Sequence, residues 1–258
     1  MKNLAAALIG IGLAIAAGPA EAQSGPQRRV EVVFGAVARG VDAGDFTFSY
    51  SQNGQSYQAS ARRRLTGFAR LMMGGSQDYT YSVSGAVDAQ GVLRPAAYRH
   101  QGGRRNRVVN AAFTANDVVT TSNPRMGMGS PAATPAQRRG VVDQVTAIAA
   151  LAASTVDPCT RTINVYMDGR SRFDFVLTPN GTVNVNTQGY RGPALRCNVD
   201  FRPIAGFSDP QERQTLTFMF ARTASGLWAP IRIEMPTDNV GIVRLEARQI
   251  TINGNRLR

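Results

Sequence analysis

Residues 163–177 read INVYMDGRSRFDFVL, with apolar and polar side chains alternating on both sides of an Asp-Gly pair. Val165 lies between polar neighbours before the pair, and Phe173 does so after it. A period of two places apolar side chains on one face of a strand, and Asp-Gly is a strong signal for a two-residue hairpin turn. The segment therefore predicts two antiparallel strands joined at Asp168 and Gly169, with one face packed on a core.

The same alternation recurs along most of the chain. It is found in residues 30–36, 46–50, 79–83, 183–185, 216–220, 231–235 and 243–247. This repetition predicts a mainly β protein made of antiparallel sheet with one buried face. No linker divides the strands into groups, so residues 23–258 are expected to form a single β-rich domain.

One helix is predicted to cover the apolar face of this sheet. Thr134 suits the N-cap, Pro135 suits the first helical position, and Gln137 completes a capping box. An apolar stripe at helical spacing follows, made of Val141, Val145, Ile148, Ala149 and Ala152. Residues 122–133, which precede it, are rich in Gly, Pro, Met and Ser, and this composition predicts a long mobile loop that could serve as a lid.

The first 22 residues have the pattern of a cleaved secretory signal peptide. Lys2 provides the basic end, residues 4–17 are apolar, and Ala20 and Ala22 form an A-x-A cleavage site. The apolar run is too short to span a bilayer. The residue directly after the predicted cut is Gln23 and the first cysteine is Cys159, so we expect a periplasmic protein without a lipid anchor.

The charge balance favours anionic partners. The chain has 29 Lys and Arg residues against 17 Asp and Glu residues, a net charge of +12. Phosphorylated lipids and acidic polymers are the anions of a bacterial envelope, and contact with a membrane surface would fit them. Export, and the lack of aromatic residues among the basic clusters, argue against nucleic acid. The alternative is that the arginines only keep the protein soluble.

The residues needed for common kinds of catalysis are scarce. Lys2 is the single lysine, so the mature chain would lack the amine of Schiff-base enzymes. His100 is the single histidine, which excludes a multi-histidine metal site, and no G-x-S-x-G motif is present. We therefore expect no cofactor, no metal and no enzymatic activity, and we expect His100 to be solvated.

Cys159 and Cys197 are an even pair in a chain that is predicted to be exported, and this context predicts a disulfide. Closing a loop of this length stabilises the fold by roughly 3–4 kcal/mol when the bridge restricts the unfolded chain. Catalytic dithiols usually lie two residues apart, so a redox-active pair is the less favoured alternative.

Four segments resemble one family of exported proteobacterial proteins. They are GVLRPAAY at residues 91–98, CTRTINVYMDGRSRFD at 159–174, YRGPALRC at 190–197 and PIAGF at 203–207. Together they resemble domain-of-unknown-function family 3108, over roughly residues 40–235. Met167 departs from the family pattern as an extra residue before the Asp-Gly turn.

The resemblance implies a secreted β-rich fold with a disulfide, and it implies no particular activity. Strongly curved sheets wrapped around a helix look like the half-barrels of periplasmic lipoprotein carriers. We therefore expect a curved antiparallel sheet, either a half-barrel or a β-spiral, around one long α-helix.

Polar residues cluster around the predicted hairpin, and they are open to three interpretations. Asp168 and Asp174 could act as paired carboxylates of a glycoside hydrolase, but Asp168 falls in the turn, where Asp and Gly169 are favoured for structural reasons. Arg172 and Asp174 share one strand face and could form an ion pair. Arg161, Arg170 and Arg172 could instead bind an anion, since arginine binds phosphate and carboxylate bidentately.

Several large apolar side chains are candidates for lining a ligand groove. Trp228 could anchor a ligand, although a lone Trp is more often part of a core. Met72 and Met73 lie in an irregular segment, as do Met126 and Met128, and flexible methionines suit an adaptable pocket.

Two functions from different classes follow. The first is a non-catalytic periplasmic binding or carrier module that holds an amphipathic or anionic, lipid-like envelope ligand in an apolar groove. The second is a structural or interaction protein of the envelope, with a filled core and an arginine-rich surface that binds a protein or a polymer.

Overall fold

The computed structural model describes residues 27–67, 70, 78–237 and 241–257. The predicted signal peptide at residues 1–22 lies outside the described residues, and so do Met72 and Met73.

Strands make up most of the described chain, as the alternating pattern predicts. In chain order they are β1 (Arg28–Ala38), β2 (Val41–Asn53), β3 (Ser56–Leu65), β4 (Tyr79–Val87), β5 (Leu93–Gly102), β6 (Arg107–Phe113), β7 (Val118–Asn123), β8 (Thr162–Met167), β9 (Ser171–Asn186), β10 (Arg191–Ala205), β11 (Gln214–Arg222), β12 (Trp228–Thr237), β13 (Gly241–Ile252) and β14 (Asn255–Arg256). The α-helix α2 (Gln144–Ala152) and the 3₁₀ helix η1 (Pro158–Thr160) lie between β7 and β8.

All the described strands belong to one antiparallel sheet. Its order is β7-β6-β5-β4-β3-β2-β1-β13-β12-β11-β10-β9-β8, and β14 also pairs with β13. Two meanders, β1–β7 and β8–β13, are joined where β1 pairs with β13. Strands β7 and β8 form the two edges, and α2 lies in the connection between them.

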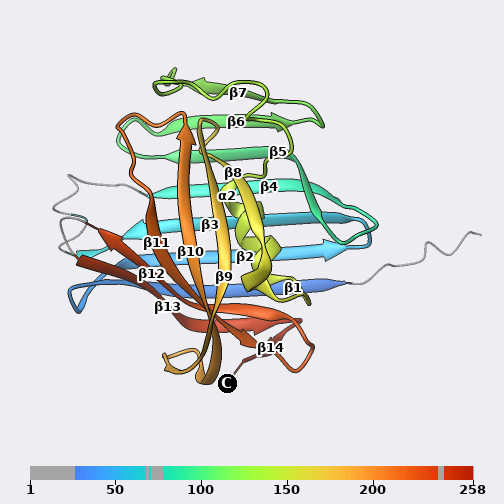
Figure 1. Ribbon diagram of the computed structural model, residues 1–258, viewed down its shortest axis with the longest axis vertical. Coiled ribbons are helices and arrows are strands. Elements are labelled where there is room, and N and C mark those ends of the chain that lie inside the picture. The colour runs from blue at the N-terminus through green and yellow to red at the C-terminus, as the bar shows by residue number, and fades with distance from the viewer. Residues whose placement is uncertain (1–26, 68–69, 71–77, 238–240, 258) are drawn as a thin grey trace, which may run out of the picture.

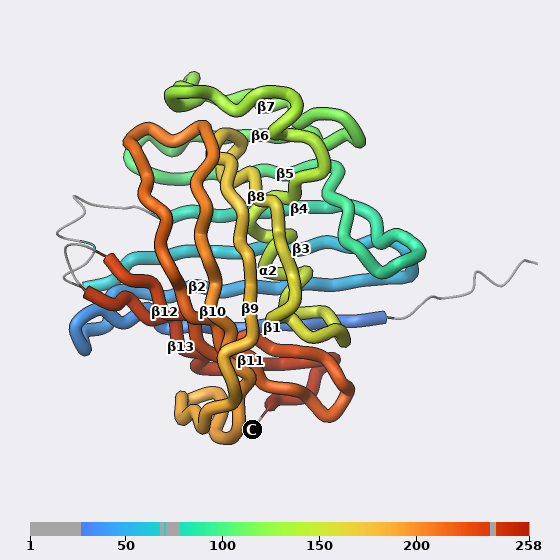
Figure 2. The backbone as a smooth tube through the Cα atoms, viewed as in Figure 1, coloured from blue at the N-terminus to red at the C-terminus, as the bar shows by residue number. Residues whose placement is uncertain are grey.

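The sheet is strongly curved and does not close. Figures 1 and 2 show β8–β10 crossing in front of β1–β5, so that one continuous sheet supplies two facing walls. Register shifts mark bulges, one of them between Ser84 and Gly85. A Cβ on Gly85 would lie 2.1 Å from the carbonyl oxygen of Arg94, so glycine is required for this close approach of two strands. Bulges bend a strand and increase its twist, which helps a ribbon to curve into a half-barrel.

Helix α2 lies between the two walls and is buried on both sides. Val145 and Ala149 belong to a core cluster that includes the inner face of β1–β5. Ala147 and Leu151 belong to a second cluster, made with residues of β8–β11. A helix that is apolar on all sides is stable only when it is surrounded by protein. The helix therefore fills the concave face of the sheet.

The helix begins later than the sequence predicts. Thr134 and Gln137 do form reciprocal capping-box hydrogen bonds: Thr134 N–H donates to Gln137 Oε1 at 2.9 Å, and Gln137 N–H donates to Thr134 Oγ1 at 3.3 Å. Gly140, with a φ of +67°, follows this turn, and no helix extends from it. Asp143 is the actual N-cap, and its carboxylate accepts from the N–H groups of Val145 and Thr146, both at 2.9 Å. The prediction of one long helix from Thr134 was wrong.

The segment predicted as a long loop begins inside β7 and is bonded to the end of β10. Ser130 N–H donates to the carbonyl of Phe207 at 3.1 Å, and Gly206 N–H donates to the carbonyl of Pro131 at 2.8 Å. Backbone hydrogen bonds at two places thus hold residues 124–133 against the sheet.

The predicted hairpin turn and the predicted disulfide are confirmed. Asp168 and Gly169 have φ values of 54° and 68°, the positive angles that a two-residue type I′ turn requires. Cys159 and Cys197 form a disulfide with a Cα–Cα distance of 5.2 Å, and both residues are fully buried. The bridge ties η1 to β10.

Candidate binding groove

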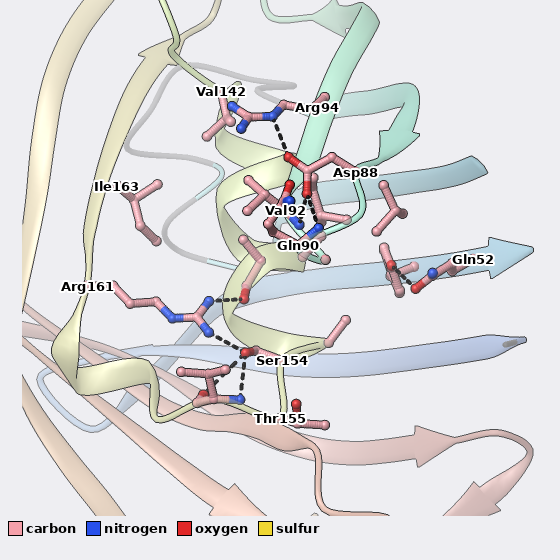
Figure 3. Close-up of a pocket in the computed structure, with 18 of the residues that line it drawn as sticks. Gln52, Asp88, Gln90, Val92, Arg94, Val142, Ser154, Thr155, Arg161 and Ile163 are labelled. Atoms are coloured by element: carbon pink, nitrogen blue, oxygen red, sulfur yellow. Dashed lines mark hydrogen bonds and ion pairs between the residues drawn. The ribbon is translucent and has the colours of Figure 1, made fainter. Parts of the chain in front are cut away.

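A groove of about 1060 Å³ lies at one end of the half-barrel (Figure 3). The last turn of α2 and the start of β8, including Ile163, form one side of it. The β2–β3 and β4–β5 turns, including Gln52 and Val92, form the other side. All of residues 122–133 are described and none of them lines this groove, so the predicted lid segment lies elsewhere in the fold.

Two half-buried arginines contact the C-terminal end of α2 inside the groove. Arg28 Nη1 donates to the carbonyl of Ala153 at 3.3 Å, and Arg161 Nη1 donates to the carbonyl of Ala150 at 2.9 Å. Arg161 Nη2 also donates to Ser154 Oγ. These bonds satisfy carbonyl groups that a helix end leaves without partners, and positive charge is favourable at this end of the helix dipole.

Neither of these two arginines forms an ion pair with a carboxylate of the described chain. Their bonds go to neutral oxygen atoms. Burial lowers the pKa of Arg161, and Asp157 opposes this effect through a longer-range attraction. Two positive charges therefore face the groove without a bound counter-charge from the described residues.

The acidic residue at the rim of the groove is already engaged. Asp88 accepts hydrogen bonds from the N–H groups of Val92 at 2.8 Å and Gln90 at 3.1 Å. Its other oxygen accepts from Arg94 Nε at 3.0 Å. The hydrogen bond from Val92 N–H lowers the pKa of the Asp88 carboxyl most, and Arg94 lowers it further. The Asp88–Arg94 pair adds no net charge, so the groove is basic.

Apolar side chains also line the groove, together with polar ones such as Gln52 and Asn164. Ile163 and Leu93 are buried, and Val92 is exposed at the groove. Val142, Ala149 and Ala153 complete the apolar lining. The groove thus combines apolar side chains with unneutralised guanidinium groups, which is the lining that an amphipathic anion requires.

The three arginines predicted to share an anion site do not come together. Arg161 lies at the groove, but Arg172 pairs with Tyr166 across the hairpin, five residues further along β8, which is roughly 17 Å of extended strand. Arg172 is buried, donates to the carbonyl of Gln137 at 2.8 Å, and forms a 2.6 Å ion pair with Asp174. Arg170 contacts the carbonyl of Gly127 at 3.4 Å.

The apolar candidates also lie outside the groove. Trp228 packs against the second core cluster, with the Arg222 guanidinium 5.5 Å from its ring centre. It reaches the groove only indirectly, because its backbone N–H donates to the carbonyl of Ser154 at 3.0 Å. Met126 and Met128 line a separate hollow of about 500 Å³ beside β7. Met72 and Met73 are outside the described residues.

Asp168 has a bonding role that the turn pattern did not reveal. Its Oδ1 accepts from Gln144 Nε2 at 2.7 Å and from the Tyr98 hydroxyl at 3.3 Å. Gln144 Nε2 also donates to the Tyr98 hydroxyl at 2.6 Å. The carboxylate thereby links the β8–β9 turn to α2 and to β5. Asp174 is held by Arg172 instead, so each of the two carboxylates is committed to a structural contact.

His100 is buried, and the prediction of a solvated histidine was wrong. Its Nδ1 lies 3.0 Å from the Tyr98 hydroxyl and 3.7 Å from Asp168 Oδ1. The rings of Tyr79 and Tyr81 pack against it. Burial lowers the pKa of His100, and the nearby Asp168 only partly opposes this effect. The neutral imidazole is therefore the favoured form in the folded protein.

Sequence reasoning found Arg161 but missed Arg28, Asp88 and Arg94. Asp88 and Gly91 are residue types that favour a turn, but nothing local places this turn opposite α2. Those contacts depend on how far the sheet curves, and curvature is set by bulges that leave no periodic signal.

Two further findings concern metal-ion clusters and membrane-spanning helices. Within the described residues, no cluster of three or more His, Cys, Asp or Glu side chains is arranged to hold a metal ion. No helix of the described chain is long and apolar enough to cross a membrane.

The comparisons with known proteins identify the family. The family model described as "Protein of unknown function (DUF3108)" matches residues 29–248, which is most of the chain. The chain therefore belongs to this family, as the four sequence segments predict. No curated protein and no solved structure matches the chain.

Proposed function

We propose that the protein is a non-catalytic binding module of the bacterial cell envelope, and that its groove binds an amphipathic anionic ligand. The observation that carries this proposal is the pair Arg28 and Arg161, which face an apolar groove without ion-pair partners among the described residues. A guanidinium group in a partly desolvated site attracts carboxylate and phosphate strongly. The predicted signal peptide supports the location.

The filled concave face restricts how such a ligand binds. Helix α2 is buried on both sides, so the interior of the half-barrel offers no room for a long apolar tail. A lipid-like ligand would have to place its apolar part along Ile163 and Val142 in the groove itself. The groove volume of about 1060 Å³ is sufficient for a small ligand or a short segment of a larger one.

The filled core also favours the second candidate, an envelope protein that binds its partner through arginine-rich surfaces. The two candidates differ in where binding occurs. Surface binding would depend on exposed arginines such as Arg62 and would weaken steeply with salt. Groove binding would depend on the half-buried Arg161.

Native mass spectrometry of the oxidised protein, purified from the periplasm, tests the proposal. Spectra of the native and denatured protein would be compared before and after incubation with an envelope extract. We expect a bound anionic mass that is lost in Arg161→Met, because this change removes the charge but keeps much of the apolar volume. Arg170→Met is the matched control, since Arg170 lies outside the groove, and it should retain the mass.

An unliganded mass in both the wild-type protein and Arg170→Met, with no uptake from the extract, would contradict groove binding. Retention of the ligand by Arg161→Met would place binding elsewhere. The melting temperature of each variant would be measured as a control for an intact fold.

A further inference from the structure

Part of the outer edge of β8 lies uncovered in the groove. Val142 pairs with Val165 on this edge: its N–H donates to the carbonyl of Asn164 at 2.9 Å, and its carbonyl accepts from Tyr166 N–H at 2.8 Å. Outward and inward backbone groups alternate along an antiparallel edge strand. The N–H and C=O of Thr162 and the N–H of Asn164 therefore point outward as well.

These three backbone groups belong to residues at the surface of the groove. Thr162 and Asn164 are both exposed, and both line the groove. The β8–β9 ladder uses the alternate positions, because the Arg161 carbonyl accepts from Leu177 N–H at 2.8 Å on the inner side. No bond to the outward groups of Thr162 and Asn164 is found within the described chain. Such unpaired donors and acceptors form a template for one more strand.

The geometry points to an extended acidic peptide as the ligand. The peptide would pair with the outer edge of β8 at Thr162 and Asn164, next to the position that Val142 occupies. This inference rests on the proposed function, because it names the ligand class of the same groove. A peptide in this position would satisfy the free groups of Thr162 and Asn164 by main-chain hydrogen bonds. Its carboxylates would lie on the strand face that carries the Arg161 side chain and would reach Arg28 and Arg161, while its alternate apolar side chains would point to the opposite face.

A peptide matches the groove better than an acyl chain does. An acyl chain leaves backbone donors and acceptors unpaired when it displaces water from them, and unpaired polar groups are costly to bury. The concave face behind the groove is filled by α2, so no deeper apolar space is open to a tail. The groove is basic and bordered by a strand edge, and both features suit an extended acidic segment.

A peptide library tests the inference. Its members are eight-residue peptides in which Asp or Glu alternates with Val, Leu or Phe, and the oxidised full-length protein selects among them. The strongest binder is then titrated against Thr162→Pro and Thr162→Ala. Proline removes the outward N–H of Thr162 and is tolerated at the first residue of a strand. Alanine removes only the side chain and is the matched control.

We expect Thr162→Pro to weaken peptide binding about tenfold or more, while Thr162→Ala changes it less than about twofold. Bound peptide should also slow hydrogen exchange at the Asn164 amide of the wild-type protein. Equal affinity of the two variants, or no retained peptide, would overturn the inference. Palmitate and phosphatidylglycerol vesicles serve as lipid probes: if they bind and peptides do not, the proposed function survives without a peptide ligand. If no probe binds, both proposals fail.

Discussion

At the scale of single residues, the protein places polar side chains where several elements meet. Asp168, Gln144 and Tyr98 come from a turn, a helix and a strand, and their hydrogen bonds hold these three elements in one arrangement. His100 packs beside them in a buried position. A buried neutral histidine makes stability depend on pH, because the unfolded chain binds its proton more readily than the folded chain does.

The pH dependence of stability should reveal this histidine. The pKa of His100 in the folded protein lies below the ordinary value of 6.5. As pH falls through 6.5 the unfolded state takes up a proton first, so the free energy of unfolding decreases. His100→Gln cannot titrate and should lack this part of the decrease. Urea unfolding of both proteins between pH 8 and pH 5 measures the difference, and parallel pH curves would contradict the prediction.

At the scale of elements, α2 determines how closely the two walls of the sheet approach. Ala149 is fully buried on the side of β1–β5, and Ala147 and Leu151 are buried on the side of β8–β11. Small side chains keep the helix thin, so that both walls contact it. Ala147 does not line the groove, and the interior is close-packed, so added volume at Ala147 has no free space to enter.

Ala147→Leu should therefore destabilise the protein by about 1–3 kcal/mol, because the larger side chain forces the walls apart. Ile148→Leu, at a half-buried position of the same helix, is the control and should cost less. The free energy of unfolding, measured in urea, distinguishes the two variants. An Ala147→Leu protein as stable as the control would show that space remains on this side of the helix.

The sequence predicts individual strands better than it predicts what lies opposite them. The hairpin around Asp168 and Gly169 was predictable because its pattern is local: alternation, then a turn pair that accepts positive φ. The helix start was misassigned, since Thr134 and Gln137 do form the predicted cap and only Gly140 ends the turn. Whether a capped turn continues as a helix depends on how the residues after it pack against the rest of the protein.

The groove was less predictable than the fold. Arg161 was recognised as part of a charged cluster, but the other charged residues that line the groove, including Arg28 and Asp88, are distant in sequence. They meet because the sheet folds back on itself, and the amount of curvature is a tertiary property. The predicted ion pair of Arg172 with Asp174 is confirmed, whereas Arg172 lies away from the groove, because it is buried under the segment that contains Gln137.

At the scale of the whole molecule, the two chain ends of the described fold lie beside each other. Arg29 N–H donates to Asn253 Oδ1, and Asn253 N–H donates to the carbonyl of Arg29, both at 2.8 Å. β1 and β13 pair along most of their length. The first long strand of the described chain, β1, is therefore hydrogen-bonded to the last long strand, β13.

A circular permutant should fold. Joining residue 257 to residue 28 through a short glycine-serine linker, and opening the chain at the β1–β2 turn between Arg39 and Gly40, preserves every strand pairing. We expect the permutant to form the Cys159–Cys197 disulfide and to melt cooperatively. Circular dichroism and thiol titration measure both properties. A permutant that stays unfolded would show that the β1–β2 connection is itself required.

The pairing of β1 with β13 also sets the order in which the protein is completed. β1 is the first strand to be synthesised and β13 is close to the last, yet each covers the other's edge in the middle of the sheet. Until residues 241–252 have been made, β1 keeps one open edge and the two meanders have no common sheet. Contacts between distant parts of a chain form slowly, because a long loop must close before they are gained. The nascent chain consequently has a long interval in which the full sheet cannot form, which would suit the export that the signal-peptide pattern predicts.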